Sequence, residues 1–297
     1  MNINIMKKLK CGLLILSTIT ASSISYGEES DYLSTTNIQI SYAKDADNDF
    51  ITGYGSDGGK RIQYRFEHQS ENSWGENYVF FDVVDLESPA GAAFGEGDTN
   101  TRENYGLWNT TLQMSKIFDT DLNFGIIKDI GLEGRFEHGS FFNYKSTAFG
   151  ASLYLDVPYF QGKQDKFQLT WWRRSNCDDF VTGPFGSADG SCYDNHNFWG
   201  LTTRKHWEMF GIKWSHQTFL RYQQETTSDA NDPDAAARHN RIFLEIELFA
   251  QVYKNLEVGA RLEHFYDEGG IDYNRTTFTP EGKSNTIPMV VIKYTFH

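Results

Sequence analysis

The sequence predicts an all-β protein, a 12-stranded antiparallel transmembrane β-barrel that occupies residues 28–297. Two observations predict this fold. Apolar and polar side chains alternate along a dozen segments, and the chain has a mean hydropathy of −0.54 although aromatic residues make up 15% of it. Because successive side chains of a strand point to opposite faces, each segment has one apolar and one charged face. A barrel with lipid outside and water inside has this pattern.

Residues 1–27 have the features of a secretory signal peptide, which is removed from the mature protein. Lys7, Lys8 and Lys10 carry positive charge without a nearby acid, and the apolar stretch 11–20 follows them. That stretch is too short to cross a bilayer as a helix, which needs about 20 apolar residues. The small residues after it are typical of a cleavage site and argue against the alternative, a retained membrane anchor.

The chain is acidic, with a formal net charge of −13. Removal of residues 1–27, which hold three lysines and no acid, makes the mature chain more acidic still. DNA and RNA bind to basic faces, so nucleic acid is excluded as a partner. After residue 27, no apolar run approaches the length of a transmembrane helix.

The alternation is clear near the C-terminus, where Glu245 and Glu247 alternate with Leu244, Ile246 and Leu248. A helical period of 3.6 residues would scatter these charges around a cylinder, so a helix is excluded here. The same pattern predicts strands at 36–44, 59–68, 76–86, 105–118, 126–138, 145–157, 166–176, 196–206, 209–225, 238–253, 256–267 and 286–297. Their number is even, as a closed barrel with both termini on the periplasmic side requires.

The predicted connections differ between the two ends of the strands. Those on one side are short, and most of those on the other are long and rich in Gly, Asp, Asn and Ser. Short periplasmic turns and long extracellular loops are typical of outer-membrane barrels. A soluble two-sheet sandwich is the alternative fold, but its strands would hide an apolar inner face instead of carrying charges throughout.

Cys177 and Cys192 are the cysteines of the mature chain, and both lie in a segment rich in Gly, Asp and Ser. An even number of cysteines in an exported chain indicates a disulfide that closes this segment. A metal site is the alternative, but no His or second Cys pair lies at ligand spacing nearby. We therefore predict a disulfide, no metal and no cofactor.

The width of a 12-stranded lumen lies between that of a barrel filled by side chains and that of an open channel. Charges of both signs on its face would create a transverse field that suits neutral or zwitterionic polar solutes over simple ions. Inward aromatic side chains would offer stacking surfaces. Wall-bracing ion pairs and gap filling are the alternative roles for these side chains. The predicted substrate-contacting residues are Arg65, Tyr78, Phe80, Asp82, Glu133, Arg135, Trp172, Arg174, Lys213, Phe219, Arg221, Glu245, Glu247, Arg261 and Glu263.

Two segments, Trp74–Val83 and Ile117–Gly125 with the nearby Lys128, resemble the nucleoside-specific channel-forming outer-membrane protein family (Tsx/OmpK-like). The resemblance is clearest from about residue 60 to 175 and in the last predicted strand. It implies a 12-stranded outer-membrane barrel through whose lumen nucleosides diffuse.

The sequence therefore predicts a passive diffusion channel for small polar solutes in the outer membrane of a Gram-negative bacterium. Nucleosides are the expected solutes, membrane lipid surrounds the barrel, a monomer is favoured, and no enzymatic activity is expected. An outer-membrane lipid hydrolase is one alternative, because His216 and Thr218 fall on the outward face, although no Asn or Asp is placed to orient the histidine. A surface receptor or adhesin that acts through extracellular loops is the other, and the predicted disulfide favours it.

Overall fold

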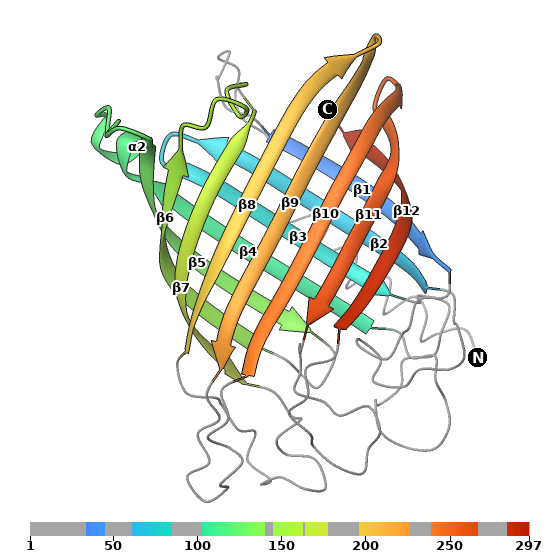
Figure 1. Cartoon of the computed structure of the whole chain (residues 1–297), viewed down its shortest axis with the longest axis horizontal. Coiled ribbons are helices and arrows are strands. Elements are labelled where there is room, and N and C mark those ends of the chain that lie inside the picture. Colours follow the sequence, from blue (N-terminus) through green and yellow to red (C-terminus); the bar gives the residue numbers. More distant parts are fainter. Residues whose placement is uncertain are drawn as a thin grey trace, which may run out of the picture.

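The protein forms one closed barrel of 12 antiparallel strands within the described residues (Figure 1). The computed structural model describes residues 34–44, 61–84, 103–139, 145–162, 164–177, 196–225, 239–266 and 284–296. Each strand pairs with its neighbours in the chain, and β1 closes the ring by pairing with β12, as between Tyr42 and Val290. The elements are β1 (Ser34–Ala43), β2 (Arg61–Asn72), β3 (Gly75–Val84), β4 (Glu103–Gln113), α2 (Met114–Phe118), β5 (Ile127–Gly139), β6 (Lys145–Leu155), β7 (Lys166–Cys177), β8 (His196–Met209), β9 (Ile212–Glu225), β10 (His239–Tyr253), β11 (Leu256–Tyr266) and β12 (Ser284–Phe296).

The predicted fold is confirmed, and each of the 12 predicted strands is present. The predicted strand 105–118 is too long, however, because Met114–Phe118 form helix α2. Asp129 accepts hydrogen bonds from the backbone N–H and the hydroxyl of Ser115, at 3.0 and 2.5 Å, and so satisfies a donor of the first helical turn. The helix ends at Asp119, whose φ of 47° is left-handed.

The two ends of the barrel differ. At the end that we call the turn end, β1 begins, β12 ends, and short connections join the strands. These connections are 73–74, 114–126 with helix α2, 156–165, 210–211 and 254–255. At the opposite end, which we call the loop end, the connections lie outside the described residues. The turn end is uppermost in Figure 1.

An aspartate fixes the connection between β6 and β7 to the barrel wall. The Asp165 carboxylate accepts hydrogen bonds from the backbone N–H of Gly162 at 2.8 Å, from the backbone N–H of His206 at 2.9 Å, and from the Lys205 ammonium. Burial raises the pKa of Asp165, but these hydrogen bonds outweigh burial and hold that pKa below its ordinary value. The connection is thereby attached to β8, which lines the lumen.

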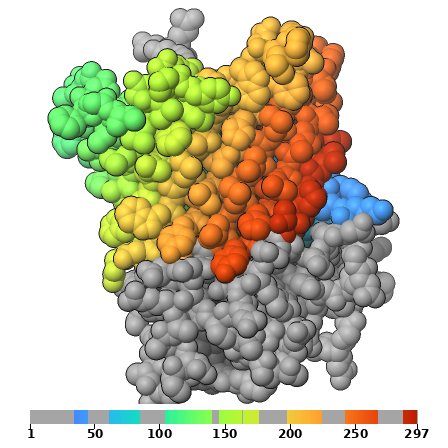
Figure 2. Space-filling view, in the orientation of Figure 1, coloured from blue at the N-terminus to red at the C-terminus, as the bar shows by residue number. Residues whose placement is uncertain are grey.

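The outward side chains form an apolar surface. Ile40, Leu132 and Phe149 are 46%, 51% and 73% exposed, and the side chains of β8 to β12 form a closely packed outer wall in Figure 2. Aromatic side chains, among them Trp108 and Trp199, also face outward. In lipid every backbone polar group must be bonded within the protein, and a closed ring of strands does this because it has no edge. The barrel is therefore an outer-membrane barrel.

Helix α2 is five residues long, and no helix among the described residues is long and apolar enough to cross a membrane. Residues 1–27, predicted to be a signal peptide, lie outside the described residues. The same holds for Cys192 and for the side chain of Cys177, so the disulfide stays a prediction.

Candidate functional site

The structure places the predicted substrate-contacting residues on the inner face of the barrel. Tyr78, Phe80 and Phe219 are half-buried there, and Lys213 is exposed near the turn end. The remaining ones are buried, namely Arg65, Asp82, Glu133, Arg135, Trp172, Arg174, Arg221, Glu245, Glu247, Arg261 and Glu263. Whether they contact a solute stays a prediction, but the structure brings most of them together in two networks.

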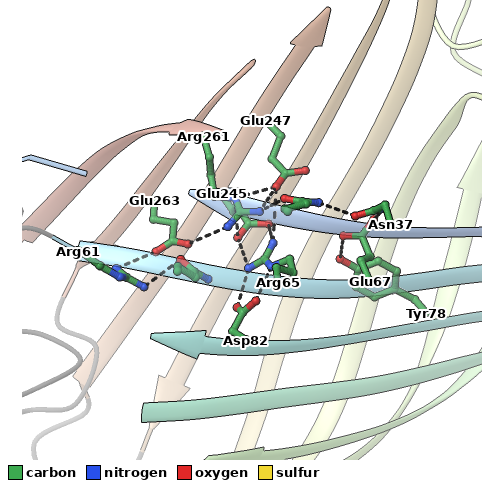
Figure 3. A network of polar contacts seen from close by, with 12 residues as sticks. Asn37, Arg61, Arg65, Glu67, Tyr78, Asp82, Glu245, Glu247, Arg261 and Glu263 are labelled. Carbon is green, nitrogen blue, oxygen red and sulfur yellow. Dashed lines mark hydrogen bonds and ion pairs between the residues drawn. The ribbon is translucent and has the colours of Figure 1, made fainter. Parts of the chain in front are cut away.

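The first network crosses the lumen (Figure 3). Arg65 on β2 donates two hydrogen bonds to Asp82 on the neighbouring β3, at 2.8 and 2.9 Å. The same guanidinium donates two more to Glu245 on β10, at 2.9 and 3.0 Å. Strands β1, β12 and β11 separate β2 from β10 in the ring, so Arg65 and Glu245 form a bridge through the barrel interior.

Further charges extend this network towards both ends (Figure 3). Arg261, which is 1% exposed, donates to Glu247 at 2.7 Å and also to Gln39. Arg61 donates to Glu263 at 3.3 Å. We call Arg61, Arg65, Asp82, Glu245, Glu247, Arg261 and Glu263 the first network. Four carboxylates and three guanidinium groups thus connect β2 and β3 with β10 and β11.

A second network lies on the opposite wall, on β5, β7 and β9. Glu137 accepts a hydrogen bond from Arg135 at 2.5 Å and one from Arg174 at 3.1 Å. Arg221 lies 3.8 Å from the same carboxylate. Since Glu137 and Arg221 stand on strands separated by β6, β7 and β8, this network also crosses the interior.

Aromatic rings pack against the second network. Trp172 stacks on Phe198 with ring centroids 4.5 Å apart and an angle of 20° between the rings. The Arg135 guanidinium lies 5.5 Å from the Trp172 ring centroid and 5.2 Å from that of Phe219. The stack is possible because Gly200 faces Trp172, where a Cβ atom would lie 2.3 Å from the indole ring. Three predicted site residues therefore hold one another in place beside a glycine.

Replacing Gly200 with alanine is expected to displace Trp172 and to destabilise the barrel by about 1–3 kcal/mol, the usual cost of overpacking. Urea unfolding in lipid vesicles measures this change. Gly134→Ala is the control, because the nearest atom to its added Cβ is 3.9 Å away. Equal stabilities of the two variants would contradict the packing described above.

Part of the inner face is apolar, which the alternation pattern did not predict. Phe249, Phe265, Ile287, Met289 and Val291 are buried and form a cluster on β10, β11 and β12. A signal was present in the sequence, because β12 is apolar at successive positions and not only at alternate ones. This cluster leaves one stretch of the lumen wall without charge.

A cavity of about 520 Å³, which we call the vestibule, occupies the lumen near the turn end. Its lining residues come from β1, β2 and β8 to β12, with Gln164 of the β6–β7 connection and Asn255 of the β10–β11 turn. Lys213 lies at its mouth, whereas Asn37, Glu67 and Glu247 form its inner end beside the first network. The vestibule therefore leads from the turn end to the Arg65–Glu245 bridge.

The other half of the lumen is filled at the turn end. The Lys166 ammonium on β7 lies 2.6 Å from Glu76 on β3, and Gln113 donates to the same carboxylate at 3.0 Å. Glu133 accepts hydrogen bonds from Gln168 and, at 3.3 Å, from Thr170. These contacts explain why the vestibule lies off the barrel axis, towards β8–β12, β1 and β2.

The residues of the predicted alternative, a lipid hydrolase, lie on the outward face. The Thr218 hydroxyl and His216 Nε2 are 2.9 Å apart. Among the described residues, no carboxylate contacts the His216 ring, so the third group that orients a catalytic histidine is absent from this part of the chain. The described residues also contain no group of three or more His, Cys, Asp or Glu that could hold a metal ion.

No family model and no curated protein matches the sequence. Among solved structures, OccAB3 of Acinetobacter baumannii is 10% identical with a TM-score of 0.32, over 90% of this chain and 99% of that chain. OprB of Pseudomonas putida is 8% identical with a TM-score of 0.32, over 89% and 94%. The anion-selective porin of Comamonas acidovorans is 11% identical with a TM-score of 0.20, over 90% and 100%. At these identities the likeness concerns the fold alone.

Proposed function

We propose that this protein is a passive diffusion channel for small polar solutes, and that nucleosides are the first class to test. The observation that carries the proposal is the vestibule, an off-axis cavity of about 520 Å³ that opens at one end of a closed membrane barrel. Pockets for small ligands occupy about 300–1,000 Å³, so a small solute can enter this space. No chemistry is required of the protein in this role.

The bridge at the inner end of the vestibule makes the channel narrow. A solute must pass Arg65 and Glu245, whose side chains are 2.9 Å apart across the lumen. Arg65 is 3% exposed and is held by four hydrogen bonds, so passage requires this bridge to open, and the bridge limits the rate of passage. We therefore expect the channel to have a small conductance.

The charges and rings of the lumen favour polar solutes that are neutral overall. Opposite charges on facing walls orient a dipolar solute, whereas a single ion meets repulsion from one wall. Tyr78 and Phe80 lie within the segment that resembles the nucleoside channels, and both belong to the inner face of β3. The Arg65 guanidinium lies 4.5 Å from the Phe80 ring centroid, so a base that stacks on Phe80 would replace this contact. Stacking of a base on an aromatic ring is worth about 1–3 kcal/mol.

Planar-bilayer recording of the purified protein tests the proposal. We expect small, ohmic conductance steps and a reduction of the current when a nucleoside is added at millimolar concentration. If conductance steps appear but no nucleoside reduces the current, nucleosides are excluded as solutes and the channel proposal stands. Absence of any steps, together with no solute entry into vesicles that contain the protein, would refute the channel itself.

A further inference from the structure

Three polar residues at the inner end of the vestibule lie in one row across neighbouring strands. Arg204 on β8 is directly opposite Gln217 on β9, and Gln217 is directly opposite Glu247 on β10. All three line the vestibule. Because opposed residues of antiparallel strands have Cα atoms about 4.5–5.5 Å apart, the Cα atoms of Arg204 and Glu247 are about 10 Å apart.

The polar atoms of this row are available to a ligand. Within the described part of the chain, neither the Arg204 guanidinium nor the Gln217 amide forms a hydrogen bond or an ion pair. Glu247 uses its Oε1 atom for Arg261, at 2.7 Å, and for Arg65, at 3.6 Å. Its Oε2 atom is left for another donor.

Neighbouring charges act on both ends of the row. Glu76 attracts Arg204, and Lys293 attracts Glu247. Lys166, which is opposite Arg204 on the other side, is a cation and is held by Glu76 at 2.6 Å. Nearer the mouth, Lys293 and Glu257 already form an ion pair with each other. The row therefore presents a guanidinium without an ion pair and one free carboxylate oxygen of Glu247, separated by one amide that can both donate and accept.

We propose that this row is a binding site for small zwitterionic solutes of the amino-acid class. The solute carboxylate would accept two hydrogen bonds from the Arg204 guanidinium, whose planar donors match a carboxylate. The solute ammonium would donate to Glu247 Oε2, and Gln217 would bond to either group. An anion or a cation satisfies one end only, and a neutral solute satisfies neither. The site lies on the entry path of the proposed channel but binds a class to which nucleosides do not belong.

Equilibrium dialysis of the detergent-solubilised full chain tests the site with four solutes of nearly equal size. They are alanine as the zwitterion, lactate as the anion, alaninamide as the cation and lactamide as the neutral solute. We expect alanine to bind about tenfold more tightly than each of the others, because only alanine gains both charge-assisted contacts. Equal binding of alanine and lactate, or of all four solutes, would overturn the proposal.

Single substitutions test whether alanine binds at this row. Arg204→Gln is expected to weaken alanine binding about tenfold and to leave lactamide unchanged, whereas Arg204→Lys keeps most of the preference. Arg173→Gln is the matched control, since it removes the same group at an exposed position that does not line the vestibule. If Arg204→Gln and Arg173→Gln behave alike, the site is not at Arg204.

Entry of the same four solutes into vesicles separates this site from the channel function. If alanine binds in dialysis but no solute enters the vesicles, the channel proposal is refuted and the binding-site proposal stands. If all four solutes enter the vesicles and alanine shows no binding preference, the binding-site proposal is refuted and the channel proposal stands.

Discussion

Replacing Arg65 with methionine is expected to raise the single-channel conductance and to lower the free energy of unfolding by about 3–5 kcal/mol. The guanidinium is 3% exposed and donates four hydrogen bonds, two to Asp82 and two to Glu245. Its removal opens the bridge between β2 and β10. It also leaves two buried carboxylates without their principal counter-charge, which is the costly way to break a buried ion pair.

Planar-bilayer recording and urea unfolding in vesicles measure the two effects of Arg65→Met. Lys213→Met is the control, because Lys213 is exposed at the mouth of the vestibule and takes no part in either network. An unchanged conductance in Arg65→Met would mean that the narrowest point of the pore lies elsewhere. An unchanged stability would mean that the two carboxylates are protonated or hydrated in the variant.

Replacing Leu132 with arginine is expected to destabilise the barrel in a membrane by about 2–4 kcal/mol. Leu132 lies in the middle of β5, points outward and is 51% exposed, so lipid covers it in the membrane. Transfer of a guanidinium to the bilayer centre has this cost because hydrocarbon offers no hydrogen-bond partner. Urea unfolding in vesicles measures the difference from the unmodified protein.

Ile126→Arg provides the comparison for Leu132→Arg. Ile126 is 60% exposed but precedes β5 at the turn end, where an arginine costs about 0–1 kcal/mol near the interface. The difference between the two variants therefore reports depth in the membrane. If both arginines were tolerated equally, the outer surface would not be covered by lipid.

The direction of the side chains could be predicted from the sequence because it depends on a period of two, which is a local property of each strand. Glu245 and Glu247 were expected inside, and both lie in the first network. The partners of these side chains could not be predicted. Arg65 and Glu245 are 180 residues apart, and they meet only because the ring closes with a particular register.

Two local features also escaped prediction, for different reasons. Alternation continues through Leu112 and Met114, whereas the helix that begins there depends on Asp129, a side chain from the next strand. In β12, Met289 and Val291 were not expected to form part of an apolar inner wall, because the pattern assumes a polar lumen. Residues from β1, β10 and β11 supply the rest of that cluster, and these strands come together only in the folded barrel.

The pairing of β1 with β12 has a consequence for the biogenesis of the protein. The first and last strands of the described chain are neighbours, so the final row of hydrogen bonds forms between residues from opposite ends of the sequence. Contacts of such long range form slowly. Until the last strand arrives, the strands at the gap have unpaired edges that favour aggregation. Until the ring closes, the edges of β1 and β12 are therefore the part of this barrel that is most open to wrong pairing.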